Sequence, residues 1–142
     1  MSEMKTQPTG ASVDAFIASV ENAGRREDAA TVLNMMNRVT GATPLMWGDS
    51  LIGYGEYDYQ RADGSRHRFF MTGFSPRKAN LVIYAMTGVK NHSGLLEKLG
   101  PHRHSVSCLY LGRLKNIDLG VLEQIAAADF AAMQRLHPDH TL

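Results

Sequence analysis

Two stretches near the start of the chain carry apolar residues at the spacing of an amphipathic helix. The first follows Ser12, a residue type that caps helix N-termini, and can end at Gly24. The second runs from about Arg26 to Thr40, and Gly41 is suited to terminate it in the left-handed conformation. The pattern therefore predicts two consecutive helices before the first strand.

Farther along, the pattern changes to that of strands. Residues 51–59 and 66–74 are rich in β-forming side chains and are bounded by turn residues. Residues 81–86 form a short continuous apolar run, which is typical of a central strand. A further strand is expected at residues 106–111.

The first two strands should form a hairpin. Asp63-Gly64 lies between them and favours a two-residue turn, which would place Tyr57 opposite Phe70. A single layer of helices covers only one face of such a sheet. The face expected to form the core carries Tyr57, Phe70 and Phe74 beside Gly53 and Gly55.

Two more helices are expected, one before and one after the last strand. The first contains three leucines and stops at Gly100-Pro101, and the second runs from its cap Asp118 to about Leu136. The predicted order is ααβββαβα. It describes an α+β fold with an antiparallel sheet of about four strands and helices mainly on one face.

The chain has the length of one domain. We expect a single domain over residues 1–142, with its core at about 12–136 and flexible ends at 1–11 and 137–142. Fifteen basic and fourteen acidic residues give a net charge of +1, which argues against a nucleic-acid binder. The longest apolar run is too short to span a bilayer, and one cysteine permits no internal disulfide. We therefore expect a cytoplasmic protein that contacts no membrane.

Several separate motifs occur in the order found in a known family. The chain resembles the YdhG-like family of domains of unknown function, and the resemblance spans about residues 12–125. It rests on Met46-Trp47-Gly48, Gly53-Tyr54-Gly55, Gly73-Phe74-Ser75-Pro76-Arg77-Lys78-Ala79-Asn80-Leu81 and Ser107-Cys108-Leu109-Tyr110.

The resemblance implies a small bacterial cytoplasmic protein with an α+β fold near the frataxin-like domains. Some members are labelled iron chaperones, so iron or other metal handling is the alternative function. Frataxin-like iron binding depends on an acidic ridge on the first helix and the neighbouring strand. Here the first helix offers only Asp14 and Glu21, and we expect iron binding to be weak.

The most suggestive candidate site is the turn at Ser75, Pro76, Arg77 and Lys78. Two cations and several backbone N–H groups at a strand end can hold a carboxylate or phosphate, although the same charges also suit a solvated connection. Trp47 comes just before the first strand and could line a pocket with Tyr54, Tyr57 or Tyr84, and the alternative is that it anchors the core. Large aromatics more often do the latter.

Candidate metal ligands are His102, His104 and Cys108, whose even spacing puts them on one face of an extended segment. The alternative is two loop histidines beside a buried structural cysteine. We identify no catalytic residue and no cofactor. The expected function is a non-catalytic small-ligand or protein-binding domain, with metal handling second and a small enzyme of hidden active site third.

The sheet face away from the helices suggests a partner surface. Apolar groups set among polar ones on an open face are typical of contact surfaces, for a second copy of the chain or another protein. On the expected register this face carries Tyr54, Phe69 and Met71 among Glu56, Asp58 and His67.

Overall fold

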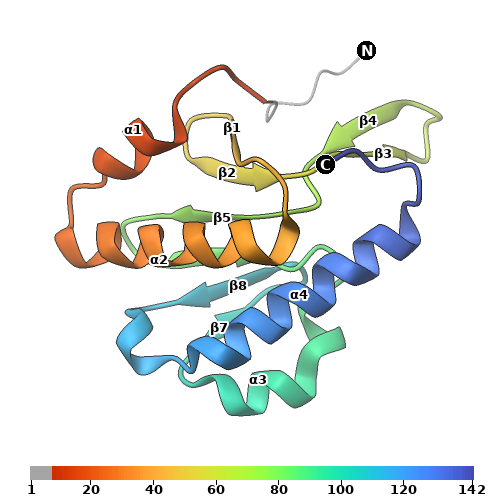
Figure 1. Ribbon diagram of the computed structural model, residues 1–142. Helices are drawn as coiled ribbons and strands as arrows, with labels where there is room; N and C mark the ends of the chain where they lie inside the picture. Colours follow the sequence, from red (N-terminus) through yellow and green to blue (C-terminus); the bar gives the residue numbers. More distant parts are fainter. Residues whose placement is uncertain (1–7) are drawn as a thin grey trace.

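A computed structural model describes residues 8–142 of the chain (Figure 1), and it begins with the two expected helices. The Ser12 hydroxyl accepts a hydrogen bond from the Ala15 N–H and caps α1 (Val13–Ala18). The Asn22 side chain does the same for α2 (Ala23–Thr40). Gly41, at a φ of 64°, ends α2 in the left-handed conformation that glycine adopts without strain.

Two antiparallel sheets follow. The larger has the strand order β1-β2-β5-β6-β8-β7, and the smaller is the hairpin β3-β4. The hairpin extends from the β2 and β5 ends of the larger sheet (Figure 1). The strands are β1 (Leu45–Trp47), β2 (Leu51–Tyr54), β3 (Tyr57–Gln60), β4 (Arg66–Phe69), β5 (Thr72–Pro76), β6 (Leu81–Tyr84), β7 (Arg103–His104) and β8 (Cys108–Leu111).

The second half of the chain supplies the remaining helices. The short 3-10 helix η1 (Val89–His92) leads directly into α3 (Ser93–Leu99). After β8, η2 (Leu114–Asn116) leads to α4 (Leu119–Leu136). The Asp118 carboxylate accepts the Val121 N–H and caps α4, as its sequence predicts.

The α+β class, the antiparallel sheet and the four α-helices are confirmed, but the expected number of strands is wrong. The described residues form eight strands in the order ααββββββαββα, in place of ααβββαβα. Each long strand expected at 51–59 and 66–74 breaks in two, the first at Gly55, where φ is 69°. The added strands β1 and β7 have three residues and two residues, too few to show a period of two.

The expected register of the hairpin is also wrong by one residue, because Tyr57 pairs with Phe69 and not with Phe70. Gln60 pairs with Arg66, and the Arg61 N–H donates to the Ser65 carbonyl at 2.8 Å, so the loop has three residues rather than two. Gly64, at a φ of 88°, completes this wider turn. A shift of one residue moves the side chains of one strand to the other face of the sheet.

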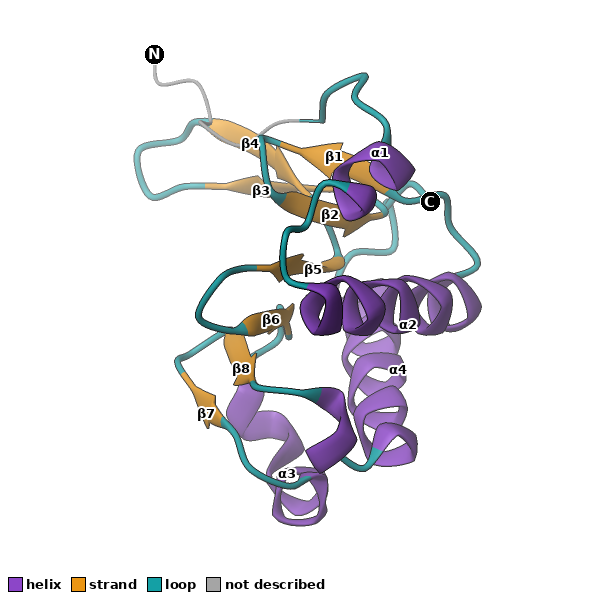
Figure 2. Ribbon diagram, turned by 90° about the vertical axis from the view of Figure 1, so that its left-hand side faces the viewer, coloured by secondary structure: helices purple, strands orange, loops and turns teal. Residues whose placement is uncertain are grey.

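Helices α2 and α4 cover one face of the larger sheet (Figure 2). The strand register places alternate residues on that face, and together with apolar side chains of the helices they form the main core. The strand residues in this core are Met46, Ile52, Tyr54, Phe74, Leu81, Ile83, Leu109 and Leu111.

The residues expected on an open contact surface are largely enclosed, because the actual register turns them inward. Tyr54 is fully buried, and its hydroxyl donates to Asn37 Oδ1 on α2 at 2.8 Å. Burial raises the pKa of Tyr54, so the hydroxyl keeps its proton. Met71 is fully buried against α4, and Phe69 is half-buried beside Trp47. Tyr54 and Met71 are therefore not exposed on a sheet face.

Both described ends of the chain lie against strands. The Thr9 N–H donates to the Met46 carbonyl at 2.8 Å, whereas residues 1–7, also expected to be flexible, lie outside the described residues. At the other end, Thr141 and Glu56 exchange two backbone hydrogen bonds of 2.7 and 2.9 Å. The tail expected to be flexible thus pairs with the segment between β2 and β3. Within residues 8–142, no helix combines the length and apolarity needed to cross a bilayer.

Gly53 provides a test of this packing. A Cβ at Gly53 would lie 2.6 Å from Trp47 Cδ1 and 2.8 Å from Phe70 Cβ. We expect Gly53→Ala to lower the free energy of unfolding by about 1–3 kcal/mol, the usual cost of overpacking a core. Gly112→Ala is the control, because a Cβ there meets nothing within 4 Å. Urea unfolding at the same midpoint for both variants would contradict the described contact of Trp47 with the sheet.

Candidate functional site

A pocket of about 640 Å³ lies where the turn between α1 and α2 meets the turns at the ends of the central strands. Ser75 fixes one wall, because its hydroxyl donates to the Ser50 carbonyl at 2.6 Å and joins β5 to the turn between β1 and β2. The Arg77 N–H donates to the Asn80 carbonyl at 2.9 Å and closes the β5–β6 turn. The lining residues include Phe16, Val20, Glu21, Asn22, Arg25, Ser50, Pro76, Arg77 and Lys78.

Three cationic residues line this pocket and come from two distant parts of the chain. Arg77 and Lys78 come from the β5–β6 turn, and Arg25 comes from the first turn of α2. None of the three forms an ion pair with a carboxylate in the described part of the chain. Among the lining residues that the structure describes, Glu21 is the one acid. The pocket is therefore electropositive, and the N-terminus of α2 adds to this potential.

Arg25 is held in place by the backbone. One of its terminal nitrogens donates to the Gly112 carbonyl at 3.1 Å, while its Nε is buried and has no hydrogen-bond partner among the described residues. Arg26 supports the same turn by donating to the Val20 carbonyl at 2.6 Å. The guanidinium of Arg25 is thus held in position, and no carboxylate of residues 8–142 forms an ion pair with it. The apolar side chains of Phe16, Val20 and Pro76 complete the lining.

Three aromatic rings pack in a row on the sheet face opposite the main core, and the last of them contacts Arg77. Trp47 packs edge-on against Phe70 with centroids 5.6 Å apart, and Phe70 packs edge-on against Tyr84 at 5.3 Å. The Tyr84 hydroxyl then accepts a hydrogen bond of 2.9 Å from Arg77. This row links the candidate aromatic residues to the candidate cationic turn.

The predicted site residues therefore divide into two groups. Arg77 and Lys78 line the pocket. Ser75 is fully buried behind it, and Tyr84 contacts Arg77 without lining the pocket. Trp47 is 1% exposed, which agrees with its interpretation as a core anchor rather than a pocket wall.

The structure stacks the rings of His102 and His104 with centroids 6.2 Å apart, but it does not bring Cys108 into the same group. The chain reverses between β7 and β8, so their even spacing does not put them on one extended segment. His102 Nδ1 contacts the Gly100 carbonyl at 2.8 Å, and Cys108 lies half-buried opposite Tyr84. The described residues contain no cluster of three or more His, Cys, Asp or Glu side chains that could hold a metal ion.

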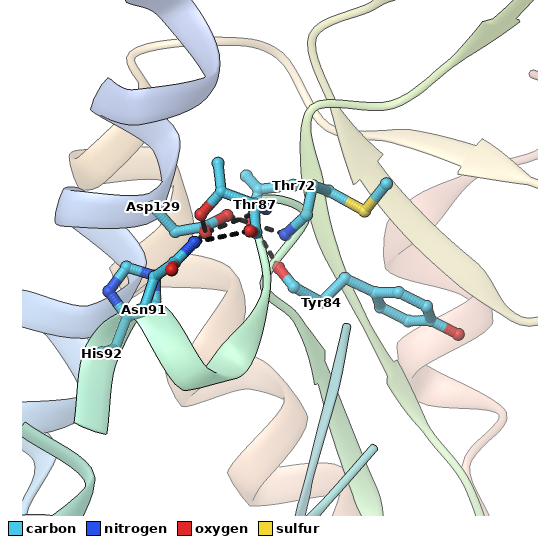
Figure 3. A network of polar contacts seen from close by, with 7 residues as sticks. Thr72, Tyr84, Thr87, Asn91, His92 and Asp129 are labelled. Atoms are coloured by element: carbon cyan, nitrogen blue, oxygen red, sulfur yellow. Dashed lines mark hydrogen bonds and ion pairs between the residues drawn. The ribbon is translucent and has the colours of Figure 1, made fainter. Parts of the chain in front are cut away.

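Sequence reasoning missed a second polar cluster, centred on Asp129 of α4 (Figure 3). Asp129 is 1% exposed and accepts hydrogen bonds from the Met86 N–H at 2.8 Å and the Thr87 N–H at 3.2 Å. It also accepts the Thr87 hydroxyl and contacts His92 Nε2 at 3.0 Å. This carboxylate joins α4 to the segment between β6 and η1.

A signal for this cluster does exist in the sequence. Asp129 follows Ile125 by four residues and precedes Met133 by four, so it lies on the apolar stripe of α4. A carboxylate on a buried helix face requires hydrogen-bond partners, because desolvation of an unpaired charge is costly. The sequence does not identify those partners, which are 37 to 43 residues away.

Comparison with known proteins returned no match among protein-family models, curated proteins or solved structures.

The contact between Arg77 and Tyr84 gives a testable titration. Burial raises the pKa of Tyr84 above its ordinary value, and the positive charge of Arg77 opposes that rise. Arg77→Gln removes the charge, so the pKa of Tyr84 should rise further. The difference in ultraviolet titration between this variant and the same variant carrying Tyr84→Phe isolates the phenol. Lys98→Gln, on α3, is the charge-matched control, and an unchanged Tyr84 titration in Arg77→Gln would contradict the contact.

Proposed function

We propose that this protein is a non-catalytic binding domain for a small anionic ligand that also carries an apolar group. The observation that supports this proposal is the convergence of Arg25, Arg77 and Lys78 on one pocket without ion-pair partners in the described chain. Arg113, by contrast, forms an ion pair with Asp28 at 2.9 Å. Cations left unpaired around a concave site are suited to a ligand.

The pocket has cationic and apolar lining residues, and together they indicate the class of ligand. A carboxylate or a phosphate would pair with the guanidinium and ammonium groups, and backbone N–H groups at the start of α2 favour the same charge. An apolar portion of the ligand would contact Phe16, Val20 and Pro76. The pocket volume of about 640 Å³ is in the range of small-molecule sites.

The motifs of the sequence support a wider assignment. We propose that the chain is a YdhG-like protein of bacterial origin that acts in the cytoplasm. The segment from Gly73 to Leu81 carries much of that resemblance, and it includes the cationic turn that lines the pocket. The turn would then be the part of the domain that contacts the ligand.

Binding of octanoate tests the proposal. Calorimetry should detect octanoate binding to the wild type, with octanamide as the uncharged probe of the same length and octyl phosphate as the alternative anion. Hydrogen bonds to charged groups contribute about 1.5–3 kcal/mol, so Arg77→Gln and Lys78→Gln should each weaken binding about tenfold or more. Lys98→Gln is the control and should leave affinity unchanged.

Two outcomes would contradict the proposal. Equal affinity for octanoate and octanamide would mean that the cations do not select the ligand. Equal losses in Arg77→Gln and Lys98→Gln would mean that binding responds to net charge rather than to this pocket.

A further inference from the structure

A second pocket lies on a different part of the molecule, between η1 and α4. Its volume is about 510 Å³, and it shares no lining residue with the cationic pocket. Asn91 and His92 come from η1, and Arg135 comes from the last turn of α4. The remaining wall includes the apolar side chains of Ala128, Ala132 and Leu136.

Asp129 determines which nitrogen of His92 carries the hydrogen. Two backbone N–H groups and the Thr87 hydroxyl donate to this buried carboxylate, so it acts as an acceptor. His92 Nε2, 3.0 Å from Asp129 Oδ1, must then be the donor of their hydrogen bond (Figure 3). In the neutral ring the other nitrogen, Nδ1, holds a lone pair and can accept a hydrogen bond.

His92 Nδ1 is the unused acceptor of this arrangement. The residue is 8% exposed, yet no described residue hydrogen-bonds to Nδ1, and the ring lines the pocket. If His92 served only to hold η1 against α4, the contact of its Nε2 with Asp129 would be sufficient. Arg135, which also lines the pocket, is exposed and forms no ion pair with the described carboxylates.

We propose that this pocket is a second binding site, for a small anion that carries a hydroxyl group. The hydroxyl donates to His92 Nδ1, and the anionic group pairs with Arg135. Asp129 is a positioning residue, because it holds the imidazole in the required tautomer. The site is independent of the cationic pocket, and it selects a hydroxy acid over the same acid without the hydroxyl.

Nuclear magnetic resonance of the wild-type protein tests both parts of this proposal. Long-range proton–nitrogen correlation at mildly alkaline pH should show the hydrogen of His92 on Nε2. Titration with lactate should shift the ring signals of His92 to saturation, whereas propionate, the matched acid without the hydroxyl, should bind at least tenfold more weakly. A hydrogen on Nδ1, an absence of lactate shifts, or equal binding of the two acids would overturn the proposal.

Variants separate this site from the cationic pocket and from a purely structural role. Arg135→Gln should weaken lactate binding about tenfold, and Arg77→Gln should leave it unchanged. His92→Leu replaces the imidazole by an apolar side chain and removes the acceptor, so it should abolish the preference for lactate over propionate. Retention of that preference in His92→Leu, or its loss in Arg77→Gln, would refute the assignment. The wild-type experiment decides the question if a variant fails to fold.

Discussion

The direct pairing of Gly53 with Gly73 is the constraint on which the rest of the sheet depends. A Cβ at Gly73 would clash with the Ile52 carbonyl oxygen, and one at Gly53 would clash with the Trp47 indole. Two glycines therefore let β2 and β5 approach while an aromatic ring covers them. This pairing places Ile52 opposite Phe74 on the core face and sets where each strand ends.

The positions of both pockets follow from that register. Strand β5 ends at Pro76, beside Ser50 and the first turn of α2, so the turn after it presents its cations to the pocket where Arg25 lies. Strand β6, paired with β5, ends at Tyr84, and the residues just beyond it reach Asp129 of α4. The two pockets differ in their electrostatics. Buried Asp129 accepts hydrogen bonds from several donors, whereas the cations of the first pocket have no carboxylate partner within residues 8–142.

The sequence indicates local features well and long-range convergence poorly. Caps such as Ser12 and Asp118 act on neighbouring residues, so the helix starts could be predicted from the chain alone. The hairpin register could not, because Asp63-Gly64 is compatible with turns of two or three residues. Arg77 and Lys78 were recognisable as a cationic turn, but the approach of Arg25 across some 50 residues depends on tertiary packing.

Anomalous diffraction from a bromide-soaked crystal would test the central claim that the first pocket attracts anions. The account predicts an ordered bromide within contact distance of Arg25 and Arg77, because these cations lack ion-pair partners among the described residues. A crystal in which bromide occupies other surface sites, while the pocket between α2 and the β5–β6 turn is accessible and contains none, would contradict it.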